Sequence, residues 1–176
     1  MLKYLMRDLL SALRFLPWGI GAGIVVAMII NKVNERRVRT GRKSVAALAV
    51  VCFYMYVVIL MMITFFSRES SLGRMIDLEL FSTWGINDRN NAYVIENVLL
   101  FIPYGMVCPW YLKRARHFAS CTAMGLLTSL FIEWLQLVTG RGVFQIDDIL
   151  TNMLGSMIGY IIFWILCRLI RSTGKN

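Results

Sequence analysis

Five apolar runs, each about long enough to cross a lipid bilayer, constrain this chain more than any other feature. Roughly 20 helical residues span the ~30 Å hydrocarbon layer of a membrane. The runs occupy residues 15–30, 45–66, 93–112, 118–138 and 149–170. They account for a composition that is 58% hydrophobic, more than a soluble domain usually contains. We therefore predict an all-α, polytopic membrane protein with five transmembrane helices and no separate soluble domain.

Residues 1–14 precede the first run and have a pattern of their own. Lys3, Arg7 and Arg14 share one helical stripe, whereas leucine and methionine fill most of the other positions. This pattern is typical of an amphipathic helix that lies in the membrane surface. A signal peptide is the competing interpretation, but no small-x-small cleavage site follows residue 30. We expect an interfacial segment over 1–14, an extra first span over 15–30 and a four-helix membrane domain over 45–170.

The net charge of +9 comes from basic residues with a marked sidedness. Twelve of the 19 lysines and arginines follow the first, third or fifth span, which places them on one side of the membrane: Lys32, Arg36, Arg37, Arg39, Arg42, Lys43, Lys113, Arg114, Arg116, Arg168, Arg171 and Lys175. The positive-inside rule assigns this side to the cytoplasm. We therefore expect the N-terminus outside and the C-terminus inside, and topology explains the charge without a nucleic-acid partner.

Cysteine and histidine usage excludes several kinds of site. The four cysteines lie in or near the ends of spans and form no C-x-x-C pair, so they are expected to be small buried residues. His117 is the one histidine and falls on the expected cytoplasmic side. We accordingly predict no metal, no cofactor and no histidine-based catalytic triad.

Polar residues gather around the turn between the fourth and fifth spans. Glu133 and Gln136 share one helical face before the turn, and Asp148 and Asn152 share one face after it. By topology the start of the third span lies on the same outer side. Polar groups inside a membrane are costly and commonly functional. The candidate ligand-binding residues are Asn97, Glu133, Gln136, Arg141, Asp147, Asp148 and Asn152.

Two expectations concern the charges of this cluster. An ion pair of Arg141 with Glu133 or Asp148 would offset much of the cost of placing a carboxylate in the membrane. One carboxylate of the pair Asp147–Asp148 is expected to cap the fifth span and to interact with its helix dipole.

Glycine and proline mark places where helices are expected to pack closely. Pro103 and Gly105 predict a kink in the third span whose freed carbonyl groups are satisfied by neighbouring helices. Gly155 and Gly159 have the small-x-x-x-small spacing that allows two membrane helices to touch through their backbones. The long loop over residues 67–92 has two open interpretations, a lid at the membrane interface and an inert surface loop.

These residues resemble the VanZ-like family of bacterial membrane proteins. The resemblance rests on the patterns Asn97-x-x-x-Phe101-x-Pro103-x-Gly105, Glu133-x-x-Gln136, Arg141 and Asp148-x-x-x-Asn152-x-x-Gly155-x-x-x-Gly159, and it covers residues 45–170. One segment departs from the family, which often has Asn-Leu-x-Pro-Phe where this chain has Asp77-Leu-Glu-Leu-Phe81. The resemblance implies a multi-pass protein of the bacterial plasma membrane. It also implies a connection with resistance to teicoplanin, a lipid-tailed glycopeptide antibiotic.

Three functions from different classes remain open. We favour a non-enzymatic protein whose outer polar pocket binds an amphiphile, namely a membrane lipid, a lipoglycopeptide or a lipid-linked cell-wall precursor. The second is an intramembrane enzyme in which Glu133 and Asp148 act as general acid and base on a lipid-linked substrate, with Mg²⁺ as an optional cofactor. The third is a structural protein whose polar groups fix helix packing and whose basic loop contacts partners.

Overall fold

The computed structural model describes residues 1–66 and 76–173. Within these residues six α-helices account for most of the fold: α1 (Leu2–Ala12), α2 (Leu16–Arg39), α3 (Ala47–Phe66), α4 (Asp88–Tyr111), α5 (Phe118–Thr139) and α6 (Ile146–Thr173). Two short 3-10 helices are η1 (Leu13–Phe15) and η2 (Lys113–Arg116). Strands β1 (Ile76–Asp77) and β2 (Phe144–Gln145) form a parallel pair in which Ile76 lies opposite Phe144.

The five predicted transmembrane helices are confirmed. Among the described residues, five helical segments are long and apolar enough to cross a membrane, and α1 to α2 count as one of them because η1 continues the helix between them. Helix α2 continues to Arg39, past residue 30, where the predicted first span ends. The basic residues Lys32, Arg36 and Arg37 therefore lie on the last turns of a helix and not in a loop.

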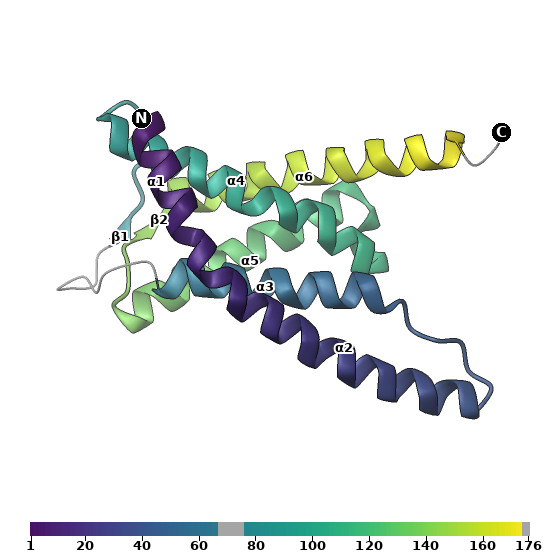
Figure 1. Ribbon diagram of the computed structural model, residues 1–176. Coiled ribbons are helices and arrows are strands. Elements are labelled where there is room, and N and C mark those ends of the chain that lie inside the picture. Colours follow the sequence, from purple (N-terminus) through teal and green to yellow (C-terminus); the bar gives the residue numbers. More distant parts are fainter. Residues whose placement is uncertain (67–75, 174–176) are drawn as a thin grey trace.

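Helix α1 changes direction at η1 and crosses over the first half of α4 (Figure 1). The amino group of Met1 forms an ion pair with Asp88, at 2.7 Å, which attaches the start of α1 to the start of α4. Large apolar side chains of α1 remain exposed, among them Leu2, Met6 and Leu10. Whether residues 1–14 lie in the membrane surface stays a prediction.

Glycine residues bring α4 and α6 into backbone contact. A Cβ added at Gly105 would overlap the Ser156 carbonyl oxygen, and one added at Gly155 would overlap the Val98 carbonyl oxygen. A Cβ at Gly159 would overlap the carbonyl oxygen of Ile102. Pro103 is exposed on the opposite side of α4, which continues through it as one helix to Tyr111.

The apolar core surrounds this contact and extends to α3 and α5. Its buried members are Leu60, Phe101, Tyr104, Cys108, Ala115, Cys121 and Ile132. The Tyr56 hydroxyl donates to the Leu100 carbonyl oxygen at 3.0 Å and so links α3 to α4. The Tyr104 hydroxyl lies 3.0 Å from the Thr128 hydroxyl and links α4 to α5.

The two ends of the bundle differ in character (Figure 1). At one end, here called the site end, α3 and α5 finish, α4 and α6 begin, and β1 pairs with β2. At the opposite end lie the end of α2, η2 and the end of α6, which carry most of the three predicted groups of basic residues. Lys175 lies outside the described residues. This arrangement brings the predicted polar residues toward the site end: Asn97, Glu133, Gln136, Asp148 and Asn152.

Candidate functional site

A buried polar cluster lies among α4, α5 and α6 near the site end. Helix α5 contributes Ser129, Glu133 and Gln136, and each of them is at most 1% exposed. Helix α6 contributes Asp147, Asp148, Asn152 and Ser156, none of which is more than 6% exposed. The faces that the i, i+3 and i, i+4 spacings define therefore point into the bundle.

Two side-chain hydrogen bonds join helices across this cluster. The Asn97 side-chain amide donates to Asp148 Oδ1 at 2.7 Å, which joins α4 to α6. The Asn152 side-chain amide donates to Ser129 Oγ at 2.8 Å, which joins α6 to α5. Interhelical bonds of this kind contribute about 0.6–2 kcal/mol each in a membrane. The cluster therefore supports the packing of three helices.

Glu133 and Gln136 fix the last turns of α5 to β2 and to the end of α3. Glu133 Oε2 accepts a hydrogen bond from the Gln145 backbone N–H at 3.0 Å, and the Gln136 side-chain amide donates to the Thr64 carbonyl oxygen at 3.1 Å. Gly140 ends α5 in the left-handed conformation, with φ of 65°, and the Arg141 N–H donates back to the Gln136 carbonyl oxygen. This hydrogen-bond pattern is a common helix C-terminus that requires a residue such as glycine.

Asp147 binds a different part of the chain from the one expected. Its two carboxylate oxygens accept hydrogen bonds from the backbone N–H groups of Phe81, at 2.8 Å, and Thr83, at 3.0 Å. Both Asp147 and Asp148 lie in the first turn of α6, where negative charge is favourable to the helix dipole. Asp147 is therefore a clamp on the segment that precedes α4, and the expected capping of α6 by one of the two carboxylates stays a prediction.

Asp77 is a second carboxylate that organises this segment. It accepts hydrogen bonds from the Ser82 hydroxyl at 2.8 Å, the Glu79 backbone N–H at 3.1 Å and the Gln145 side-chain amide at 3.4 Å. These donors, the Ser82 hydroxyl first, hold the pKa of Asp77 below its ordinary value. The bonds therefore stabilise the folded segment at neutral pH and weaken as the pH falls toward that lowered pKa.

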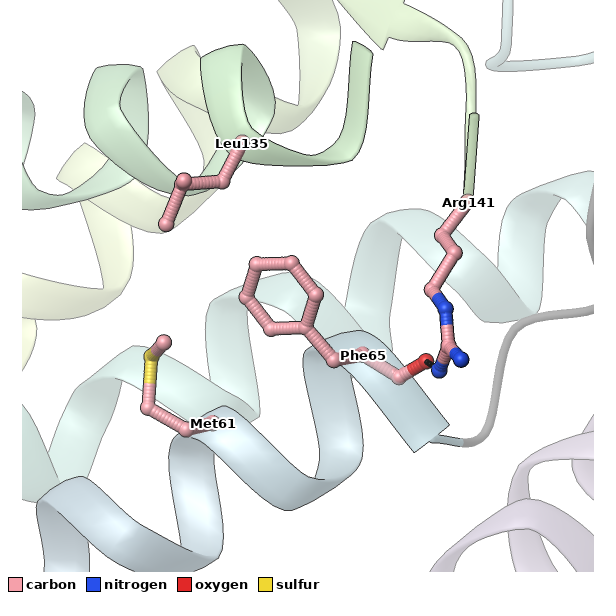
Figure 2. A pocket seen from close by; sticks show the side chains of 4 residues that line it. All are labelled: Met61, Phe65, Leu135 and Arg141. Atoms are coloured by element: carbon pink, nitrogen blue, oxygen red, sulfur yellow. Dashed lines mark hydrogen bonds between the residues drawn. The ribbon is translucent and has the colours of Figure 1, made fainter. Parts of the chain in front are cut away.

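Arg141 lies apart from the buried cluster. Its side chain leaves the turn after Gly140 and reaches the end of α3, where Nη1 donates to the Phe65 carbonyl oxygen at 3.1 Å (Figure 2). Among the residues that the structure describes, the ion pairs are Met1–Asp88 and Arg7–Asp8, and the expected pair of Arg141 with Glu133 or Asp148 is absent. The physical reason is that those two carboxylates face the interior of the bundle, whereas the left-handed Gly140 directs Arg141 toward its surface.

A groove with a volume of about 350 Å³ opens between α3 and α5 beside this arginine. It is lined by Met61, Phe65, Leu135 and Arg141 (Figure 2). Three of these side chains are apolar, and the guanidinium stands at the end nearest the turn. Of the seven candidate ligand-binding residues, Arg141 is the one that lines the groove; the other six belong to the polar cluster or its margin.

Sequence reasoning missed the apolar part of this groove. Met61, Phe65 and Leu135 look like ordinary residues of membrane spans, and no spacing distinguishes them. The one usable signal was topological, because the end of α3 and the end of α5 must both lie at the site end. For metals, the residues that the structure describes contain no group of three or more histidine, cysteine, aspartate or glutamate side chains that could hold an ion.

Comparison with known proteins identifies a family and a relative that this chain resembles. The model of the VanZ/LLP1 family matches residues 53–168, which include the polar cluster and the groove. The curated Protein VanZ of Enterococcus faecium is 31% identical over 86 residues, covering 49% of this chain and 50% of that protein. The chain thus matches about half the length of this relative. No solved structure matches the chain significantly.

Proposed function

The chain belongs to the VanZ/LLP1 family of membrane proteins, and from that premise we propose that it binds a lipid-tailed amphiphile in the groove between α3 and α5. The observation that carries this proposal is the composition of the groove, which combines three apolar side chains with one guanidinium at its end. An acyl chain lies against Met61, Phe65 and Leu135. An anionic headgroup, carboxylate or phosphate, binds Arg141.

The guanidinium, and not the apolar wall, decides which membrane lipid is selected. An acyl chain that moves from the bilayer into the groove exchanges one apolar environment for another, so its transfer contributes little. A hydrogen bond to a charged group contributes about 1.5–3 kcal/mol, and guanidinium binds carboxylate or phosphate with two parallel N–H donors. We therefore propose selection for anionic amphiphiles.

For a ligand that binds from water, the contributions of headgroup and tail to the binding free energy are balanced differently. Burial of an acyl chain from water is worth about 0.8 kcal/mol per CH₂ group, so the tail then contributes strongly. Teicoplanin carries such a tail, and we propose that capture of a lipoglycopeptide of this type would give resistance to it. A lipid-linked cell-wall precursor, which combines a long tail with phosphate groups, is the other ligand with the same chemistry.

The buried polar cluster has a supporting role in this proposal. Glu133 accepts a hydrogen bond from Gln145 and holds the end of α5, which lines the groove, against β2. Asp148 accepts one from Asn97 and holds α6 against α4. This use of the carboxylates favours a binding protein over the enzyme in which Glu133 and Asp148 act as acid and base.

Blocking the groove tests the proposal. Purified protein in lipid nanodiscs is titrated with teicoplanin and with its deacylated form, and the thermal stability is recorded. We expect the acylated form to raise the unfolding temperature and the deacylated form to have little effect. Leu135→Trp fills the groove and should abolish the increase.

The matched control uses the same substitution on the same helix. Leu127 is 63% exposed on the outer surface of α5, so Leu127→Trp faces lipid and should retain the wild-type response. Equal stabilisation of the wild type and Leu135→Trp would contradict the location of the ligand. Stabilisation by the deacylated form to the same extent would contradict the role of the tail.

We also propose that the groove opens toward the outer leaflet, with the N-terminus outside and the C-terminus in the cytoplasm. This orientation places the basic end of the bundle inside. In a variant whose native cysteines are replaced by serine, Gly142→Cys should react with a membrane-impermeant maleimide in intact cells, and Arg114→Cys should react after permeabilisation. The reverse labelling pattern would exclude access from outside.

A further inference from the structure

The segment over residues 76–86, here called the outer loop, has an inverted distribution of side chains. Its large apolar residues are exposed: Ile76 61%, Leu78 63%, Leu80 53%, Phe81 73%, Trp84 54% and Ile86 66%. Three of its four polar side chains, those of Asp77, Ser82 and Thr83, are less exposed, whereas Glu79 is exposed. Thr83 is 7% exposed, and Asp77 and Ser82 are half-buried and bonded to each other.

This distribution is unfavourable for a loop in water. Contiguous exposed apolar side chains of this extent on a protein surface mark contact with a membrane or with another molecule. A loop that faces water would instead expose Asp77 and Ser82 and cover Phe81 and Leu80. That exchange would be favourable in water, so the observed arrangement requires a cause.

The cause is a clamp that holds the inverted conformation. Asp147 accepts hydrogen bonds from the backbone N–H groups of Phe81 and Thr83, and Asp77 accepts one from Gln145 across the β1–β2 pair. Phe81 has φ of 61°, in the left-handed region that a bulky residue rarely adopts. Such strained positions persist where the surroundings fix them, and they are concentrated at functional sites.

We propose that the outer loop inserts Phe81, Trp84 and their apolar neighbours into the interfacial zone of the bilayer at the site end. The occupant of this surface is lipid because the surface continues that of the transmembrane helices. The loop leads directly into α4, and beside it the exposed leucines of α1 form a second apolar surface attached to α4 through Met1 and Asp88. Tryptophan is also one of the two residues enriched at this depth in a membrane.

This inference does not depend on the groove, because it concerns a different surface and requires no ligand. It assigns the outer loop the role of fixing the depth of the site end in the membrane. The clamp from Asp147 transmits that position to the start of α6, which carries the polar cluster.

The test measures the depth of the loop directly. A polarity-sensitive fluorescent amino acid is placed at position 81, or at position 42 as a control, in full-length protein reconstituted into phosphatidylcholine–phosphatidylglycerol vesicles. Arg42 follows the polar turn after α2, and its side chain is exposed. Quenching is compared between iodide, present on both sides of the vesicle, and lipid that carries a shallow nitroxide.

We expect nitroxide lipid to quench position 81 at least threefold more strongly than position 42, and iodide to show the reverse preference. Strong quenching of position 81 by iodide would overturn the proposal because it would place the loop in water. Protection of position 81 from both quenchers would also overturn it, since the loop would then be covered by a second copy or another protein.

A second variant tests the clamp in the same assay. Asp147→Asn keeps the size of the side chain but removes one of its two acceptor oxygens, so one of the two backbone N–H groups loses its partner. We expect nitroxide quenching at position 81 to fall by about half. Glu35→Gln, which changes an exposed carboxylate on α2, should leave it unchanged. Equal quenching in wild type and Asp147→Asn would show that the clamp does not set the depth of the loop.

Discussion

Gly159→Leu should prevent the folding of this protein. A Cβ at position 159 would overlap the Ile102 carbonyl oxygen and would lie 2.9 Å from the Gly105 Cα, both of them backbone atoms of α4 that cannot move aside separately. Overpacking that side chains can absorb costs about 1–3 kcal/mol, and a backbone overlap costs more. We expect a loss of at least about 3 kcal/mol, or most of the monodisperse protein, measured by size-exclusion chromatography and thermal unfolding in detergent.

The control for this change is another glycine on a membrane helix. Gly21 lies on an exposed part of α2, and a Cβ there would meet no atom within 4 Å. Gly21→Leu should therefore preserve yield and unfolding temperature within a few degrees. If Gly159→Leu behaved like Gly21→Leu, α4 and α6 could not be in backbone contact.

Arg141→Ala should have the second largest effect, on binding and not on folding. Arg141 is exposed at the surface of the bundle, where its guanidinium donates to the Phe65 carbonyl oxygen, so its removal opens no cavity in the core. A charged hydrogen bond to an anionic headgroup contributes about 1.5–3 kcal/mol, which corresponds to a roughly 10- to 150-fold increase in Kd. We expect this increase for anionic amphiphiles and a much smaller one for zwitterionic amphiphiles with the same tail.

Arg141→Lys separates charge from geometry in this prediction. Lysine keeps the positive charge but loses the planar fork that binds carboxylate or phosphate with two N–H groups. Its Kd should therefore fall between those of the wild type and Arg141→Ala, as measured by ligand titration in nanodiscs. A Kd for the anionic ligand that is the same in all three proteins would remove Arg141 from the site.

Hydropathy was sufficient to predict the five spans because membrane helices must satisfy their backbone hydrogen bonds internally. It was less reliable at the ends. Helix α2 continues to Arg39 because arginine and lysine are good helix formers, so the basic residues that end the apolar run do not end the helix. Helix α4 begins earlier than its apolar run, at Asp88, because the Asn87 side chain accepts a hydrogen bond from the Asn90 N–H and caps the helix.

The polar cluster could be located from residue spacing, but its hydrogen-bond partners could not. The spacings of Glu133–Gln136 and Asp148–Asn152 placed these side chains on inward faces at one end of the bundle. Their partners include backbone groups such as the Gln145 N–H and the Thr64 carbonyl oxygen. Every residue has such backbone groups, so the sequence contains no signal for the ones that are used.

The position of Arg141 shows how a single turn changes the interpretation of a charge. The sequence places an arginine between two carboxylates and favours an ion pair. The left-handed Gly140 and the bond from the Arg141 N–H to Gln136 turn its side chain toward α3 instead. The same turn creates the charged end of an otherwise apolar groove, which no local pattern in Met61, Phe65 or Leu135 predicts.

The proposal that an anionic amphiphile binds in the groove between α3 and α5 is tested most directly by an experiment that locates the bound molecule. A photoreactive amino acid is placed at position 135 in the groove or at position 127 on the lipid-facing side of α5, and adducts formed in membranes are identified by mass spectrometry. We expect position 135 to yield anionic amphiphiles well in excess of their share of the membrane, Arg141→Ala to remove this excess, and position 127 to sample bulk lipid. Adducts of the same composition at both positions would contradict a selective binding site in the groove.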